Sequence, residues 1–186
     1  MVAGVTSRMG SLEGKISLPG FSDVVEAHKS MVYSIAWHFL RDRAIAEELA
    51  QDVFLELHRN WPSMQSAQHI VFWLRKVTSR RSIDVVRKRR TRAETSLEEM
   101  TEPTALERVH DSMLSSYLER MVASLPEKQR IAIVLRYQED MEPEQIAEAL
   151  DMNVNTVKSQ ISRALDFLRA KTARRLNPGG EQYDAV

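Results

Sequence analysis

The chain has 186 residues with 26 basic and 26 acidic side chains, 43 % hydrophobic content and no cysteine, which is typical of a soluble globular protein and excludes disulfides and thiolate metal sites. Its length allows one medium domain or two small ones. No apolar run reaches the length of a membrane span, and the N-terminus lacks the apolar core of a signal peptide, so we expect a cytoplasmic protein without membrane contact of its own.

Three helices are predicted in the N-terminal half. After a loose extension at 1–20, apolar residues recur three and four positions apart from 21 to 39, which is the periodicity of a helix. A second helix is expected at 44–59, and Trp61-Pro62 ends it because the residue before a proline is pushed out of the helical region. A third, longer helix is expected from about residue 68.

An acidic segment with little apolar content follows, and we interpret it as a flexible linker. Helices are expected again at 113–125, 126–139, 143–150 and 153–175. Pro126 and Pro143 stand where a first helical residue would be, and Asn153 suits an N-cap. No segment predicts a strand.

The sequence therefore predicts an all-α fold with a loose extension at 1–20, a group of helices on each side of the acidic linker, and a tail at 177–186.

Basic and acidic residues are separated along the chain, although the net charge is zero. Residues 71–92 hold nine Lys or Arg and one Asp, and residues 154–176 hold six Lys or Arg and one Asp. Residues 93–111 and 139–151 hold six acids each. Clustered bases are the electrostatic footprint of nucleic-acid binding, so DNA and RNA are candidate ligands despite the neutral sum.

The stretch EQIAEALDMNVNTVKSQISRAL has the layout of a helix-turn-helix. A short helix ending at Leu150 leads through DMN into a helix whose Val154 and Val157 face inward. In this motif the second helix enters the major groove, with its N-terminal half at the base edges and with Arg163 and Arg169 at phosphates. An ordinary helical hairpin has the same spacing, so spacing alone leaves that alternative open.

The segment FWLRKVTSRRSIDVVRKRR combines aromatic residues with many bases. Bases neutralise phosphates, and aromatic faces stack on unpaired nucleobases. Trp73 and Leu74 fit better as core residues. The bases from Arg75 to Arg92 do not fit a core, and they favour a nucleic-acid surface.

One face of the helix at 44–59 is apolar and carries Ala46, Ala50, Val53 and Leu57. Leu55 falls opposite this face, beside Glu48, Gln51 and Asp52. A leucine among polar residues on an outward face indicates a protein-binding surface, although single exposed leucines are common.

No constellation typical of an enzyme is present. The five histidines are scattered, and the chain has no Gly-rich phosphate loop and no HExxH motif. The acids at 47, 48 and 52 lack a histidine partner. We therefore expect a protein that is not an enzyme and needs no metal or cofactor.

Three of these segments, in this order around an acidic linker, resemble a bacterial RNA polymerase sigma factor of the extracytoplasmic-function type. AEELAQDVFLELHRNW is similar to the family's region 2.2, and WLRKVTSRRSIDVVRKRRTR to regions 2.3 and 2.4. LPEKQRIAIVLRYQEDMEPEQIAEALDMNVNTVKSQISRALDFLR resembles region 4. The resemblance covers about residues 22–176. It implies an all-α fold of two small helical domains joined by a flexible acidic linker, the C-terminal one a helix-turn-helix, with the first domain at 21–92, the linker at 93–112 and the second domain at 113–176. It also implies a transcription initiation factor that binds core RNA polymerase, recognises the −10 and −35 promoter elements and promotes strand opening.

The resemblance also implies partners and site residues. Region 2 would bind the beta-prime clamp helices and hold the −10 element, region 4 would read the −35 element and touch the beta flap, and an anti-sigma factor would keep the protein inactive. The residues that would face the polymerase are Glu48, Gln51, Asp52 and Leu55. Those along the −10 surface would be Arg80, Asp84, Arg87 and Arg90. Those at the −35 DNA would be Lys158, Ser159, Gln160, Ser162 and Arg163.

Two residues depart from the family pattern, since Asn is frequent where Arg80 stands and an aromatic residue where Met64 stands. The −10 sequence preference is therefore open. Two other functions compete with this interpretation. A stand-alone helix-turn-helix regulator would bind duplex DNA unaided, and an RNA-binding or antitermination protein would prefer single strands.

Overall fold

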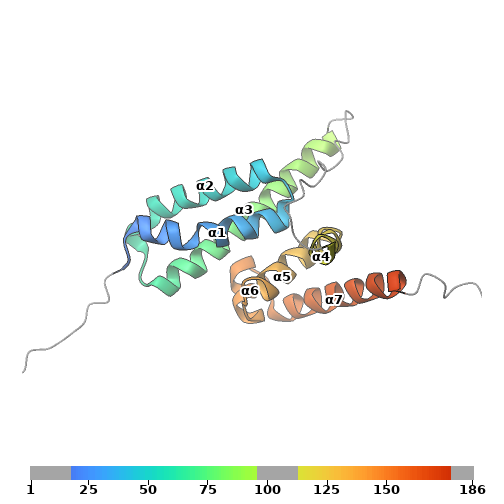
Figure 1. Cartoon of the computed structure of the whole chain (residues 1–186). Helices are drawn as coiled ribbons and strands as arrows, with labels where there is room; N and C mark the ends of the chain where they lie inside the picture. The colour runs from blue at the N-terminus through green and yellow to red at the C-terminus, as the bar shows by residue number, and fades with distance from the viewer. Residues whose placement is uncertain (1–17, 96–112, 177–186) are drawn as a thin grey trace, which may run out of the picture.

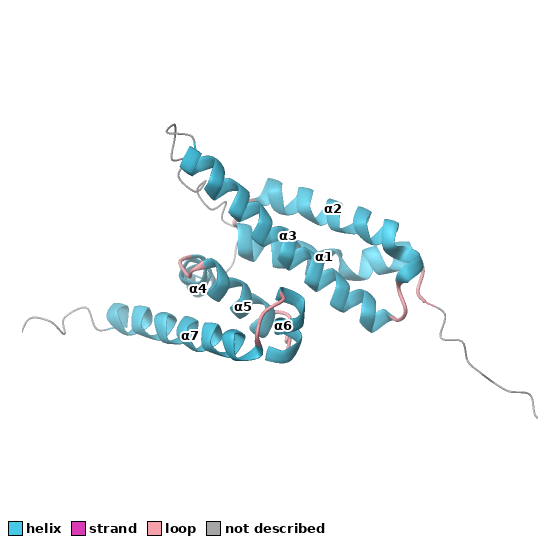
Figure 2. Ribbon diagram, turned by 180° about the vertical axis from the view of Figure 1, so that it is seen from behind, coloured by secondary structure: helices cyan, strands magenta, loops and turns pink. Residues whose placement is uncertain are grey.

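The computed structural model describes residues 18–95 and 113–176, and every regular element within them is helical, as the sequence predicts (Figure 2). The N-terminal half contains α1 (Phe21–Leu40), α2 (Arg43–Asn60), the 3₁₀ helix η1 (Trp61–Ser63) and α3 (Ala67–Thr95). The C-terminal half contains α4 (Met113–Ala123), α5 (Glu127–Tyr137), α6 (Pro143–Leu150) and α7 (Val154–Leu176). Most of the predicted extension, most of the predicted linker and the predicted tail lie outside the described residues.

Asp42 fixes the start of α2 and joins it to α3. Its carboxylate accepts a hydrogen bond from the Ile45 amide at 3.1 Å, as an N-cap does, and another from the Arg89 guanidinium at 2.8 Å. The bond from Arg89 and then the amide bond hold the pKa of Asp42 below its ordinary value. The first turn of α2 is therefore tied to the far end of α3.

Prolines and Asn153 set the helix starts in the C-terminal half. Pro143 is the first residue of α6, as predicted. Pro126 is the N-cap of α5 rather than its first residue, because its ψ of 145° is not helical and its carbonyl accepts bonds from the Gln129 and Arg130 amides. The predicted N-cap of α7 is confirmed, since the Asn153 carboxamide oxygen accepts a bond from the Asn155 amide at 2.8 Å.

Helices α1, α2 and α3 pack on one another as a three-helix group (Figure 1). Their apolar faces meet at side chains with no solvent exposure, which include Phe39, Val53, Leu57, Ile70 and Leu74. Trp73 and Leu74 contribute to this core, as the sequence predicts. The long basic helix α3 is therefore held rigidly along α1 and α2.

The C-terminal helices α4 to α7 form a second group in which α7 packs on α5 and α6 (Figure 1). A small cluster of Leu125, Ile133 and Ala164 holds α5 against α7. Val157 is fully buried on the inner side of α7, as its spacing predicts.

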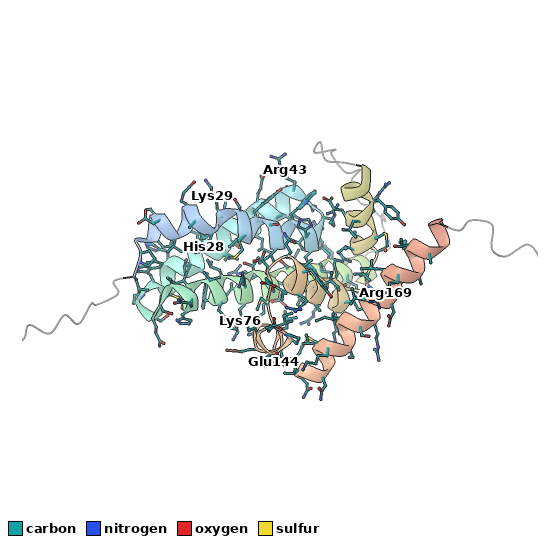
Figure 3. The ribbon with its side chains drawn as sticks, turned by 60° about the horizontal axis from the view of Figure 1, so that its bottom comes forward. His28, Lys29, Arg43, Lys76, Glu144 and Arg169 are labelled. Carbon is teal, nitrogen blue, oxygen red and sulfur yellow. The ribbon has the colours of Figure 1, made fainter. Side chains whose placement is uncertain are left out.

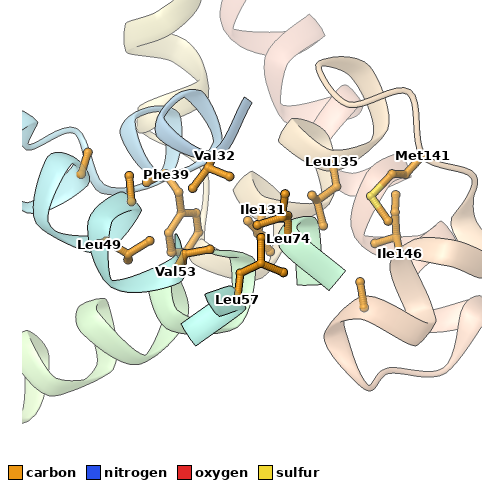
Figure 4. Packing of buried hydrophobic residues seen from close by; sticks show 14 of the residues in the cluster. Val32, Phe39, Leu49, Val53, Leu57, Leu74, Ile131, Leu135, Met141 and Ile146 are labelled. Carbon is orange, nitrogen blue, oxygen red and sulfur yellow. The ribbon is translucent and has the colours of Figure 1, made fainter. Parts of the chain in front are cut away.

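The two groups share one apolar core (Figure 4). Ile131 and Leu135 of α5 and Ile146 of α6 are at most 1 % exposed and belong to the same buried cluster as Val32 of α1 and Leu74 of α3. Helix α5 packs on α1, and α6 packs on α3. The halves that the sequence divides into two domains therefore contact each other directly in addition to being joined in sequence.

Candidate functional site

The predicted polymerase-facing residues lie together on the outer side of α2. Glu48, Gln51, Asp52 and Leu55 are all exposed, and the Leu55 side chain is 57 % exposed. The opposite side of α2 is buried against α1 and α3, which confirms that Leu55 points away from the core. An exposed leucine among acids and an amide is a suitable anchor for a partner protein.

Arg81 of α3 links this α2 face to the basic helix, and the sequence did not single it out. Its guanidinium lies 3.1 Å from the Asp52 carboxylate and 2.5 Å from the Glu56 carboxylate. A groove of about 670 Å³ runs between the two helices, with Glu48 and Asp52 on its α2 wall and Lys88 on its α3 wall. The α2 face and the α3 bases are therefore parts of one continuous surface.

The four predicted −10 residues form an exposed stripe along α3. Arg80, Asp84, Arg87 and Arg90 follow one another at helical spacing and are all exposed. Asp84 and Arg87 approach each other to 3.8 Å. Arg80 Nε donates a hydrogen bond to the Ala149 carbonyl at the end of α6, 3.0 Å away. The first residue of the stripe is therefore held by the C-terminal half.

Helices α6 and α7 form the predicted helix-turn-helix. Asp151 adopts the left-handed conformation after α6, and the Met152 amide donates to the Ala147 carbonyl at 2.9 Å, which closes the tight turn. Ala147 and Val157 are buried where the two helices meet. The small side chain of Ala147 allows this close approach.

The predicted −35 residues lie on and beside the outer face of α7. Lys158, Ser162 and Arg163 are exposed, whereas Ser159 and Gln160 are half-buried. The Lys158 ammonium pairs with the Glu144 carboxylate of α6 at 3.1 Å, and Figure 3 shows Glu144 at the α6 end of the molecule. A bond with its own amide and the bond with Lys158 hold the pKa of Glu144 below its ordinary value.

Asn155 and Thr156 are two further residues on the outer side of α7 that the family resemblance does not single out. Both are exposed in the first turn of α7. The helix-turn-helix pattern itself contains the signal for them, because the first residues of a recognition helix are those that reach base edges.

An apolar groove of about 600 Å³ lies on the C-terminal half, and no pattern in the sequence predicts it. Val122, Ile133 and Leu165 line it from α4, α5 and α7, and His38 of α1 also lines it. Leu118 and Tyr137 also line it and are 55 % and 62 % exposed. These residues have ordinary core spacing, so only the folded arrangement shows that they are left uncovered.

Met64, where the family often has an aromatic residue, is 5 % exposed and belongs to the core. Its side chain is therefore not presented on the surface before α3. Within the described residues no group of three or more His, Asp or Glu side chains is arranged to hold a metal ion. None of the described helices has both the length and the hydropathy that a membrane span requires.

Two family models match the chain. Residues 24–92 match sigma-70 region 2, and residues 115–168 match sigma-70 region 4. The region 2 match shows that the N-terminal helices are not an unrelated module attached to a helix-turn-helix, so the stand-alone regulator is not favoured.

The chain is also similar to curated proteins. It is 31 % identical over 166 residues to the ECF RNA polymerase sigma factor SigE of Mycolicibacterium smegmatis, covering 85 % of this chain and 63 % of that protein. It is 30 % identical to SigK of Mycolicibacterium vanbaalenii, with 80 % of each chain covered. It is 27 % identical to SigW of Bacillus subtilis, covering 80 % of this chain and 87 % of that protein.

Two solved structures share the fold. The sigma factor RpoE of Bartonella quintana, in complex with the anti-sigma factor NepR, has a TM-score of 0.71 at 21 % identity, covering 81 % of this chain and 94 % of that one. CnrH in complex with the cytosolic domain of CnrY has a TM-score of 0.59 at 19 % identity, covering 82 % of this chain and 87 % of that one.

Proposed function

The chain belongs to the ECF family of RNA polymerase sigma factors, and from this premise we propose that it binds core RNA polymerase, directs it to promoters with −10 and −35 elements and promotes strand opening there. The observation that supports this proposal most strongly is the combination, on one chain, of an exposed helix-turn-helix face with an outward leucine and acids on α2. A regulator that binds duplex DNA alone has no use for the second surface. No catalytic step is assigned to the chain itself, and we propose that it acts in the cytoplasm.

The outer face of α2 is the proposed contact for the beta-prime clamp helices. Leu55 supplies an apolar anchor, and Glu48 and Asp52 supply negative charge around it. A buried apolar anchor surrounded by polar contacts is the usual composition of a protein interface.

The exposed stripe of α3 is the proposed −10 surface. Arg80, Arg87 and Arg90 offer positive charge to the phosphates beside unpaired bases. Asp84 lies among them and supplies a hydrogen-bond acceptor that an all-basic stripe would lack. Because Met64 is buried, base capture falls to the surface of α3 rather than to that residue.

The outer face of α7 is the proposed −35 surface. Lys158, Ser159 and Gln160 lie near the N-terminal end that enters the major groove, and Ser162 and Arg163 follow at the next turn. Arg163 is exposed and suits a phosphate contact.

The apolar groove between α4, α5 and α7 is the proposed contact for the beta flap. Its exposed Leu118 and Tyr137 would be covered by an apolar segment of the polymerase. An anti-sigma factor is a second proposed partner of the chain, because the similar RpoE structure is a complex of a sigma factor with the anti-sigma factor NepR.

Run-off transcription from a promoter library with purified core polymerase tests this function. We expect specific start sites that appear only when the protein is added, and sequencing them gives both promoter elements. Cognate core must be used, and its binding to the protein is measured in parallel. The proposal would be contradicted if, with cognate core, the protein showed no core binding and no start site depended on it.

A further inference from the structure

The Arg81 guanidinium of α3 divides its donors between two carboxylates of α2. Its Nε and Nη2 nitrogens both donate to one oxygen of Glu56, at 2.8 and 2.5 Å. Its Nη1 nitrogen donates to the Asp52 carboxylate at 3.1 Å. Short charge-assisted bonds are the stronger kind, and two of them hold a group more firmly than one. Glu56 therefore anchors Arg81, and the single longer bond to Asp52 is the weaker attachment.

The bond to Asp52 is also the one that an incoming partner can replace. The side chain of Asp52 is 54 % exposed, whereas that of Glu56 is 32 % exposed. An ion pair that reaches solvent contributes little to stability, because water screens it and solvates the separated charges. Exchange of the Asp52 bond for another partner therefore costs the fold little.

Asp52 belongs to two surfaces at once. It is one of the four exposed residues of α2 that are proposed to face the polymerase, and it also lines the groove between α2 and α3. A cationic side chain of the polymerase that paired with Asp52 would compete with Arg81 for the same carboxylate. Binding of a partner to α2 would then leave the Nη1 nitrogen of Arg81 without its acceptor.

The released nitrogen would lie beside the proposed −10 surface. Asp84 of the exposed α3 stripe also lines the groove. Lys88 and Arg92 line it too, and they follow Arg81 along α3 at helical spacing. The stripe and the groove therefore share an edge, so a nucleic-acid strand along the stripe has the groove cations next to it. A guanidinium with a free N–H is a suitable donor to a phosphate oxygen.

We propose that Arg81 is a further DNA contact of the chain, that Glu56 positions its guanidinium, and that Asp52 withholds it until the polymerase pairs with that carboxylate. This inference rests on the proposed function, which assigns the polymerase contact to α2 and the −10 contact to α3. Glu56 keeps the guanidinium in place throughout, and only the Nη1 bond changes its partner. One side chain thus couples polymerase binding at α2 to DNA binding at α3.

Asp52→Ala removes the competing carboxylate in the absence of polymerase. Binding of the free full-length chain to a fluorescent oligothymidine strand is measured at low salt, because phosphate contacts do not depend on sequence. We expect Asp52→Ala to bind this strand about fivefold more tightly than the wild type. The matched control is Glu48→Ala, which removes the same charge one helical turn away and leaves the Arg81 bonds in place. Its gain should stay below about twofold.

Arg81→Met separates the coupling from a general effect of charge. Methionine keeps an apolar stem along the groove and removes the donors. In this background Asp52→Ala should raise affinity for the strand by less than about twofold. With core polymerase, Arg81→Met should weaken promoter binding by about fivefold, while core affinity is equal or higher because Asp52 is no longer shared. A merely structural tie between α2 and α3 predicts instead that core affinity falls together with the unfolding temperature.

Two results would overturn this proposal. One is that Asp52→Ala gives no gain in strand affinity, or an equal gain with and without Arg81, and this readout needs no polymerase. The other is that Arg81→Met lowers core affinity and leaves promoter binding of the assembled complex unchanged. If the wild-type chain bound no core polymerase and gave no specific starts, the proposed function would fail. The strand affinities of the free variants would still report whether Asp52 withholds Arg81.

Discussion

Leu55→Asp is expected to weaken binding to core RNA polymerase by about tenfold to a hundredfold, or about 1.4–2.8 kcal/mol. Leu55 is 57 % exposed on the outer face of α2, so the change removes an apolar anchor and adds a charge without disturbing the core. Equilibrium binding of a labelled variant to core polymerase measures the effect, and its thermal unfolding should match that of the wild type.

Phe167→Asp is the matched control for this prediction. Phe167 is a large exposed apolar residue on α7, with 41 % of its surface accessible, and it lies outside the α2 face and both grooves. The Phe167→Asp variant should bind core polymerase as tightly as the wild type. Core affinity that is the same for Leu55→Asp as for the wild type would remove α2 as the polymerase contact.

Arg163→Ala is expected to lower promoter-specific initiation by about tenfold while core binding survives. Arg163 is exposed on the outer face of α7 and is the proposed phosphate contact. Its removal should therefore reduce the slope of log affinity for the promoter against log salt concentration by about one. Lys158→Ala should have a smaller effect, because the Lys158 ammonium is already bonded to Glu144 and must leave that bond to reach DNA. Run-off transcription across a salt series measures both.

Lys29→Ala removes one exposed charge on α1, away from the proposed DNA surfaces, and serves as the control. It should change neither initiation nor its salt dependence. If Arg163→Ala instead reduced core binding as strongly as initiation, α7 would be a polymerase contact and not a DNA reader.

Local patterns in the sequence are sufficient to predict where the helices lie. Apolar spacing, the prolines and Asn153 act over a few residues, so each helix was predicted close to its observed bounds. Pro126 was placed one residue too far into α5, because a proline suits both the N-cap and the first helical position. The outward direction of Leu55 also followed from spacing alone, because it depends on one helix only.

Contacts between distant segments were beyond such patterns. Arg41, Arg75 and Arg130 look like ordinary surface or DNA-binding bases in the sequence, yet each bonds to the other half of the chain. Glu139 belongs to an acidic run and gives no sign of burial, although it is 8 % exposed. The acidic segment predicts a linker and the family resemblance implies two domains, but nothing local could show that the two groups of helices share a core.

The sequence likewise predicts some parts of the candidate site and not others. The basic surface from Arg75 to Arg92 is indicated by its charge, and the resemblance to the sigma factor family implies the four residues of the α3 stripe. The bond from Arg80 to the Ala149 carbonyl required the fold. The apolar groove with Leu118 and Tyr137 was invisible, because core-like spacing does not reveal which core positions lack a covering element.

Tethered cleavage of promoter DNA tests the central claim most directly. Since the chain has no cysteine, Thr156→Cys on α7 and Lys88→Cys on α3 each offer a single exposed thiol for an iron chelate that cuts nearby DNA. In the complex with core polymerase and promoter, we expect cuts near −35 from position 156 and near −10 from position 88, about 25 base pairs apart on the duplex. Cuts at one shared location, or cuts from position 156 near −10, would contradict the assignment of the two surfaces.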